Sequence, residues 1–255
     1  MGTLILRANR TIKNPKYGKL PDLDSNLRFL LDARELQLNP GSIVNRWAAS
    51  RGEGEDYERN FTFKREGIDY PTYDLVDSKK AVIFNGNSQL GNENHDKYFA
   101  SVSTYVVVAK TNNQPAQSMS RILTGDAADS GNLNYYHSIA HYGNQIEMIT
   151  AHESVGNATQ YKKSTSASPG WFVGVFVFDG SRSKMLTSDN DSIVYAPSLR
   201  SVGQDFIMLG SSPSYTSKSG SAFNGAISLV AQYERSFTER EMRAAIDFYR
   251  NEFGI

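Results

Sequence analysis

The 255-residue sequence contains no cysteine, so several kinds of chemistry are excluded at once. A disulfide framework, a thiolate nucleophile and a cysteine-ligated metal site all need that residue. The sequence also has no apolar run near the roughly 18 residues that a membrane helix requires. Its N-terminal apolar stretch is too short for a signal peptide. We therefore expect a soluble protein, made without an export signal, that does not bind a membrane.

An overall charge is lacking too, because 27 basic residues balance 27 acidic ones. Without a global field there is no reason to expect nucleic acid as a partner. The positive charges are nevertheless placed unevenly, since five of them precede the first acidic residue, Asp22. These five residues are Arg7, Arg10, Lys13, Lys16 and Lys19.

Residues 1–26 are therefore predicted to form a basic N-terminal arm, and residues 27–255 a single domain. Leu4, Ile5 and Leu6 could add a short strand to the sheet edge of a neighbouring subunit, while the five cations meet an acidic surface. We take these eight residues as the predicted partner-binding set. The alternative is a solvated terminus without a partner.

Short strands separated by polar loops dominate the rest of the chain. The clearest is 170–178, where valines alternate with phenylalanines, so that both faces are apolar and the strand is expected at the centre of a sheet. A tight turn at Asp179-Gly180 and a return strand at 182–187 follow. The Ser-rich pieces 163–169 and 211–221 are predicted as exposed loops. The other predicted strands are 27–32, 81–84, 103–110, 120–124, 136–142, 145–150, 192–195, 205–209 and 225–233.

One helix is predicted, at residues 239–253. Thr238 and Glu241 have the spacing of a capping box, and Phe237 and Met242 that of a hydrophobic staple. Gly254 is placed to end the helix. An apolar stripe at helical spacing should pack against the sheets; it consists of Met242, Ala245, Ile246, Tyr249 and Phe253.

Four stretches together resemble the concanavalin A-like, laminin-G-type jelly rolls. They are LDARELQLNPGSIVNRWAAS at 31–50, AVIFNG at 81–86, GWFVGVFVFDGS at 170–181, and FIMLGSS with FNGAISLVAQYERSFTEREMRAAIDFY between 206 and 249. The resemblance implies an all-β jelly-roll sandwich with a short C-terminal helix and a buried Trp47. These are packing motifs, which specify a scaffold and not a site. Together with the strand patterns they predict burial of Trp47, Phe84, Trp171, Val175, Phe206, Ile227, Leu229 and Met242.

No set of catalytic residues is evident in the sequence. Glycoside hydrolysis needs two carboxylates about 5–5.5 Å apart or farther, and no strand presents such a pair. Glu147 stands alone and is interpreted as a surface strand position. His137 and His141 have a spacing that suits zinc on a helix, but they lie in a predicted strand. We therefore expect no enzyme activity and no cofactor.

Two loops carry oxygen ligands that calcium prefers. The first, GDAADSGN, offers Asp126, Asp129 and Asn132, and the first two are taken as the candidate metal ligands. The second is the turn at 189–191. Both also have the composition of ordinary turns, where Asp, Asn and Gly are favoured for backbone reasons alone.

A glycan site would combine aromatic side chains with amides on loops. The best such set in the sequence is Asn132, Asn134, Tyr135 and Tyr136, with Tyr161 and Tyr215 farther along the chain. The alternative is that these tyrosines are ordinary positions on the strand faces of a tyrosine-rich β protein.

The jelly roll, the basic arm and the absence of cysteine and of a signal peptide together resemble bacteriophage virion proteins of this fold. The resemblance implies a non-enzymatic structural component, decorating the capsid or associated with the tail, that is made in the host cytoplasm and located in the virion. Its partners would be other viral structural proteins or further copies of itself. The alternative is a carbohydrate-binding module that recognises a host surface glycan, and a glycoside hydrolase is the third candidate.

Overall fold

The computed structural model describes most of the chain after the arm. The described residues are 13–14, 18–19, 23, 25–53, 59–64, 66–92, 102–112, 119–129, 133–154, 157–166, 168–197, 206–211 and 222–255. Only the backbone is described at 13–14, 18–19, 126–129, 133–136, 150–154, 157–163 and 206.

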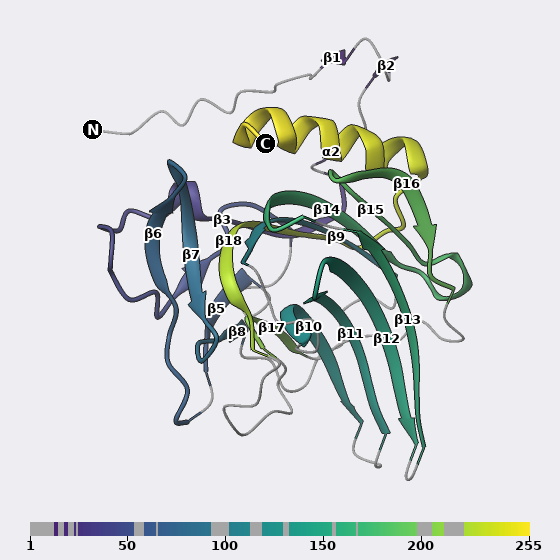
Figure 1. The fold of residues 1–255 in the computed structure, drawn as a ribbon, viewed down its shortest axis with the longest axis horizontal. Coiled ribbons are helices and arrows are strands. Elements are labelled where there is room, and N and C mark those ends of the chain that lie inside the picture. Colours follow the sequence, from purple (N-terminus) through teal and green to yellow (C-terminus); the bar gives the residue numbers. More distant parts are fainter. Residues whose placement is uncertain are drawn as a thin grey trace.

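The described elements are strands, two short 3₁₀ helices and one α-helix (Figure 1). In chain order they are β1 (Lys13–Asn14), β2 (Gly18–Lys19), β3 (Leu27–Asp32), η1 (Ala33–Glu35), β4 (Trp47–Ala48), β5 (Asn60–Phe63), β6 (Thr72–Val76), β7 (Lys79–Asn85), β8 (Leu90–Asn92), β9 (Ser103–Thr111), β10 (Met119–Asp129), β11 (Leu133–Tyr142), β12 (Gln145–Ser154), β13 (Asn157–Ser166), β14 (Gly170–Phe178), η2 (Gly180–Arg182), β15 (Lys184–Thr187), β16 (Asn190–Tyr195), β17 (Phe206–Leu209), β18 (Asn224–Tyr233) and α2 (Glu239–Phe253).

Two antiparallel sheets form the sandwich. The helix-side sheet has the order β16-β15-β14-β9-β18-β7-β6, with β3 also paired to β18, and α2 lies across it (Figure 1). The opposite sheet has the order β13-β12-β11-β10-β17-β8-β5-β4. The fold is thus the predicted all-β jelly-roll sandwich with a C-terminal helix.

Strand β14 is apolar on both faces because it is covered on both. Phe172 and Phe176 point between the two sheets, whereas Val173, Val175 and Val177 belong to the cluster that contains α2. The strand lies between β9 and β15, so its predicted place inside a sheet is confirmed. The turn that follows is longer than expected: it runs through η2, and the return strand starts only at Lys184.

The predicted core is largely confirmed, with one clear exception. Six of its eight members are 0% exposed: Trp47, Phe84, Val175, Ile227, Leu229 and Met242. The side chain of Phe206 lies outside the described part of the chain. Trp171 is the exception, because its side chain is only partly buried, although it packs against the cluster that contains α2. The loop predicted at 163–169 is wrong in part, since β13 extends to Ser166 and pairs along its whole length with β12.

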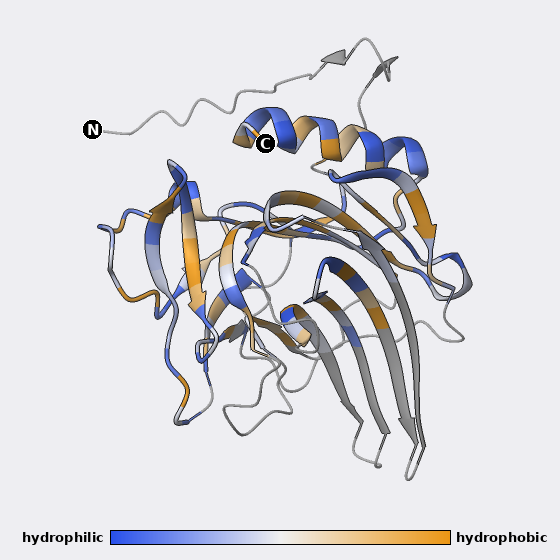
Figure 2. Ribbon diagram, in the orientation of Figure 1, coloured by the Kyte–Doolittle hydropathy of each residue, from blue (hydrophilic) through white to orange (hydrophobic). Residues whose placement is uncertain are grey.

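Helix α2 begins and ends where the sequence predicts. Thr238 and Glu241 form the reciprocal capping box, and Gly254 has the left-handed φ of 61° that ends a helix without a Cβ clash. Its apolar stripe packs on the valines of β14 and β9. Figure 2 shows hydrophilic and hydrophobic residues alternating along the helix. No helix within the described ranges is long and apolar enough to cross a membrane.

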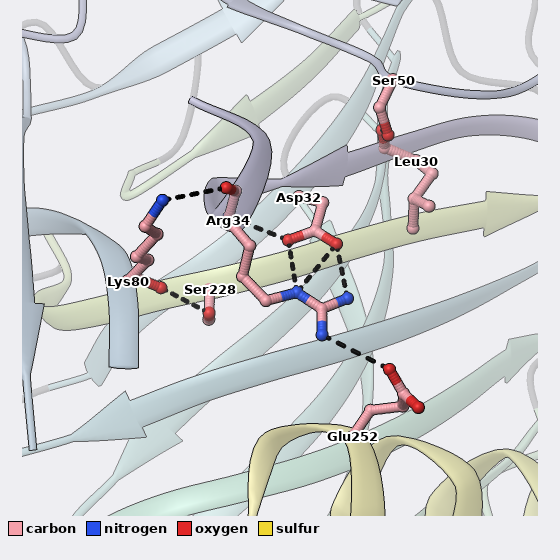
Figure 3. A network of polar contacts seen from close by, with 7 residues as sticks. All are labelled: Leu30, Asp32, Arg34, Ser50, Lys80, Ser228 and Glu252. Carbon is pink, nitrogen blue, oxygen red and sulfur yellow. Dashed lines mark hydrogen bonds and ion pairs between the residues drawn. The ribbon is translucent and has the colours of Figure 1, made fainter. Parts of the chain in front are cut away.

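A polar network fastens the end of α2 to the start of the domain (Figure 3). The guanidinium of Arg34 donates to both carboxylate oxygens of Asp32, at 3.0 and 2.7 Å, and lies 3.6 Å from Glu252. It also lies 4.2 Å above the ring centre of Phe253. Asp32 is only 4% exposed, so this bidentate partner offsets the cost of burying its carboxylate.

Replacing Arg34 by alanine should therefore lower the free energy of unfolding by about 1–3 kcal/mol, because the buried carboxylate of Asp32 loses its guanidinium partner and keeps the backbone N–H of residue 34. Urea denaturation would measure this loss. Glu252→Gln is the matched control, since its longer and more exposed contact predicts a change within about 0.5 kcal/mol. If both variants lost the same free energy of unfolding, the contribution of Arg34 would not come from its contact with the buried Asp32.

Candidate functional site

Part of the outer face of the helix-side sheet carries polar side chains beside a partly exposed tryptophan. Side chains alternate along β14, so Trp171 points to the same face as the valines beneath α2. Strand pairing places four residues in one row across the sheet. They are Trp171 of β14, Lys110 of β9, Ala226 of β18 and Ile83 of β7. Trp171, Lys110 and Ile83 are all only partly buried.

Asp77, in the turn between β6 and β7, holds the tryptophan and the lysine together. Its Oδ2 accepts from Trp171 Nε1 at 3.0 Å and from Lys110 Nζ at 2.8 Å. Lys79 Nζ lies 5.9 Å from the centre of the indole ring. We call these four residues, Trp171, Asp77, Lys79 and Lys110, the indole patch.

The turn that presents Asp77 has an unusual backbone. Asp77 and Ser78 have φ values of 51° and 65°, and the third described non-glycine residue with positive φ is Asn26. Two successive residues with positive φ form a type I′ turn, whose twist matches that of the two strands in a two-residue hairpin. The left-handed conformation costs roughly 1–2 kcal/mol per residue that carries a Cβ, and glycine is the usual solution there. The chain places a carboxylate at this position instead.

The indole patch contains one carboxylate, from Asp77, and two ammonium groups, from Lys79 and Lys110. The hydrogen bond from Lys110 is the main cause that lowers the pKa of Asp77, so this carboxylate stays ionised at neutral pH. Its side chain is 57% exposed and that of Lys110 is 25% exposed, so both groups remain within reach of a ligand. One carboxylate and two ammonium groups leave the patch with a net charge of +1.

Three asparagines border the indole patch on the same face. Asn224 of β18 pairs with Asn85 of β7, and Asn112 follows directly after β9. Asn112 Nδ2 donates to Asn224 Oδ1 at 3.3 Å, and all three side chains are exposed. We call these residues the asparagine rim. Amides both donate and accept hydrogen bonds, which suits a ligand rich in hydroxyl groups.

The arrangement has the groups that a binding site for a small polar ligand uses. A flat indole surface beside convergent polar groups is what a small polar ligand with an apolar face needs. Hydrolysis of a glycosidic bond would require a second carboxylate near Asp77. None of the residues that we assign to the indole patch or its rim supplies one.

Sequence reasoning missed this site because its members are far apart in the chain. Asp77 and Trp171 are 94 positions apart, and only the strand register brings them together. The apolar run around Trp171 also made it look like a core residue. One signal was available: the lysine that ends the apolar run of β9 occupies the same face as Trp171.

The site residues predicted from the sequence mostly lie where side chains are not described. Leu4, Ile5, Leu6, Arg7, Arg10 and Lys16 lie outside the described residues, as do Asn132 and Tyr215. Only the backbone is described for Lys13, Lys19, Asp126, Asp129, Asn134, Tyr135, Tyr136 and Tyr161. One correction follows from the backbone: Asp126 and Asp129 belong to strand β10, where they pair with Tyr136 and Leu133, and not to a loop.

The second predicted calcium loop is a turn whose side chains form hydrogen bonds within the protein. Asp189 accepts from the backbone of Ser168 and from Ser188 Oγ, and Asn190 donates to Thr165 Oγ1 of β13. These contacts join the edges of the two sheets. Within the part of the chain that the structure describes, no group of three or more His, Asp or Glu residues is placed to hold a metal ion.

The two strand histidines are buried. His137 is 4% exposed and stacks on Phe178 with ring centres 4.2 Å apart, and burial lowers its pKa to about 3. Burial also lowers the pKa of His141, which is 0% exposed. Neutral histidines are compatible with metal binding, but among the described residues these two belong to no group of three or more side chains that could hold a metal ion.

The surface position expected for Glu147 is wrong, because this side chain is 3% exposed. Strand register places it in one row with Ala140 and Arg121, which is also buried. Both Arg121 and Glu147 have interaction partners. Glu147 is therefore a buried polar residue of the opposite sheet and not a solvated strand position.

The chain is similar in fold to solved structures, all at low sequence identity. The binding domain of botulinum neurotoxin serotype D/C matches with a TM-score of 0.57 and 8% identity, over 88% of this chain and 52% of that one. A Trypanosoma rangeli sialidase in complex with sialic acid matches with a TM-score of 0.55 and 10% identity, over 88% of this chain and 33% of that one. The chain thus spans about half and a third of these two proteins.

A shorter match is the CBM40 domain of a Ruminococcus gnavus sialidase bound to α2,3-sialyllactose, with a TM-score of 0.45 and 15% identity, over 58% of this chain and 83% of that one. No protein-family model and no curated protein matches the sequence. At these identities, the likeness to the neurotoxin domain and the Trypanosoma sialidase establishes the fold alone.

Proposed function

We propose that this chain is a non-catalytic carbohydrate-binding domain and that the indole patch is its glycan site. This was the alternative reading of the sequence. The observation that carries the proposal is the partly exposed indole of Trp171, which bonds Asp77 beside two lysines, with three asparagines on the same face of the sheet. A sugar ring offers an apolar face for the indole and hydroxyl groups for the amides and the carboxylate.

Free hydrogen-bonding capacity supports the proposal. Both described hydrogen bonds to Asp77 use Oδ2, so Oδ1 remains open to accept from a hydroxyl group. The asparagine rim adds donors and acceptors on the same face. Two of the similar structures, a toxin binding domain and a sialidase in complex with sialic acid, agree with a scaffold that can present a sugar site. None of the three similar structures reported above is a viral protein, so the virion role stays a prediction.

Screening the purified protein on an oligosaccharide array, followed by calorimetric titration of the strongest ligands, tests the proposal. Trp171→Ala should weaken their binding by at least about tenfold, because a stacked aromatic anchor commonly contributes 2 kcal/mol or more. Tyr195→Ala is the matched control: Tyr195 is 57% exposed, lies on β16 and bonds Glu239, outside the patch. It should leave affinity unchanged.

Two results would count against the proposal. One is an array without any saturable ligand. The other is a ligand that Trp171→Ala binds as tightly as the original protein, which would place the sugar site elsewhere on the sandwich.

A further inference from the structure

The charges of the indole patch point to a particular class of sugar. Resting on the proposed glycan function, we propose that the ligand is a carboxylated sugar and that Lys79 binds its carboxylate. Lys110 already has a carboxylate partner, because its Nζ lies 2.8 Å from Asp77 Oδ2. In the described part of the chain no carboxylate lies within ion-pair distance of Lys79. Its charge acts on Asp77 as the last of the causes that lower the pKa of that carboxylate, and the patch keeps a net charge of +1.

The position of Lys79 suits an anion carried by a stacked ring. Its Nζ is 5.9 Å from the centre of the indole, close to the outer limit of about 6 Å for a cation–π contact. A pyranose ring in van der Waals contact with the indole lies about 3.5–4 Å from it. The flexible Lys79 side chain can then shift aside from the ring and donate to a carboxylate attached to the stacked sugar.

Asp77 sets the orientation of such a ligand. Its free Oδ1 accepts from a hydroxyl group but repels a carboxylate, so the acid group turns toward Lys79 and the hydroxyl groups turn toward Asp77 and the rim. Lys79 and Ile83 project from the outer face of the same strand, which keeps the ammonium beside the indole. The specificity thus comes from one attractive and one repulsive charge.

Titration calorimetry with three probes tests this inference: α2,3-sialyllactose, trigalacturonic acid and lactose. We expect at least one of the two carboxylated probes to bind about tenfold or more tightly than lactose, as a charge-assisted hydrogen bond provides. Lys79→Gln should remove this preference, so that the acid probes bind no more tightly than lactose does to the same variant. Raising the ionic strength about tenfold should weaken binding of the acid probe, because an exposed ion pair is screened.

Lys80→Gln is the matched control. Lys80 is the next residue of β7, faces the other side of the strand and donates to the backbone oxygen of Arg34, so its loss should leave all three affinities unchanged. The ratio between sialyllactose and trigalacturonic acid identifies which carboxylated sugar fits better.

The outcomes separate this inference from the proposed function. If lactose binds as tightly as both acid probes and still requires Trp171, the carboxylate inference is overturned while the glycan function stands. If the acid preference survives Lys79→Gln, the assignment of Lys79 is wrong. If no sugar binds in a Trp171-dependent way, the proposed function itself fails.

Discussion

Replacing Trp47 by alanine is expected to lower the free energy of unfolding by about 3–5 kcal/mol. Trp47 is 0% exposed and belongs to the cluster between the two sheets, where it lies directly across from Phe61 of β5. Its indole nitrogen has no hydrogen-bond partner, so the loss comes from packing and from the cavity left behind. Guanidinium denaturation followed by circular dichroism would measure it.

Trp171→Ala is the informative comparison for this variant. Both substitutions remove the same atoms, but Trp171 is partly exposed and its indole bonds Asp77 at the surface. We expect a clearly smaller loss of stability than for Trp47→Ala. Equal losses would mean that Trp171 is a core residue, as its sequence pattern suggested, and would weaken its assignment to a binding surface.

Acid is expected to destabilise the domain before its carboxylates titrate. A histidine in the unfolded chain has a pKa near 6.5, whereas burial lowers the pKa of His137 to about 3. Below about pH 6.5 the unfolded state therefore binds a proton that the folded state does not. Stability is highest above this pH and falls by about 1.4 kcal/mol for each unit down toward pH 3. The lowered pKa of His141 adds to the same trend.

His137→Phe tests this expectation because it keeps an aromatic ring against Phe178 and removes the titration. The free energy of unfolding, measured by denaturation from about pH 7 to pH 5, should fall less steeply with decreasing pH in the variant. The difference in slope should be up to about 1.4 kcal/mol per pH unit. Identical slopes in the two proteins would show that His137 is protonated in the folded state. His141 remains in both proteins and serves as the internal reference.

Patterns that depend on neighbouring residues predicted the fold well. The alternation of Val and Phe at 170–178 identified an interior strand, and the Thr238–Glu241 spacing located the start of α2 to the residue. Short or polar strands were missed: β4, β5, β6 and β8 have two to five residues, too few to show a period. β13 was taken partly for a loop because its Ser and Thr residues carry no apolar alternation.

The candidate site could not be predicted in the same way, since it depends on strand order. Trp171, Lys110 and Asp77 meet only because β14 pairs with β9 and because the turn after β6 reaches the same face. A single sequence gives the face on which each residue lies but not which strands are neighbours. The burial of Glu147 was missed for a related reason, because its row partner Arg121 lies on another strand.

The two tryptophans of the chain allow a direct test of where a sugar binds. In a nitrogen–proton correlation spectrum each indole N–H gives one signal, and Trp171→Phe assigns them by removing one. Titration with α2,3-sialyllactose or trigalacturonic acid should shift the Trp171 signal, whose N–H bonds Asp77, and leave that of buried Trp47 in place. A saturable ligand that leaves the Trp171 signal unmoved would contradict the assignment of the indole patch as the glycan site.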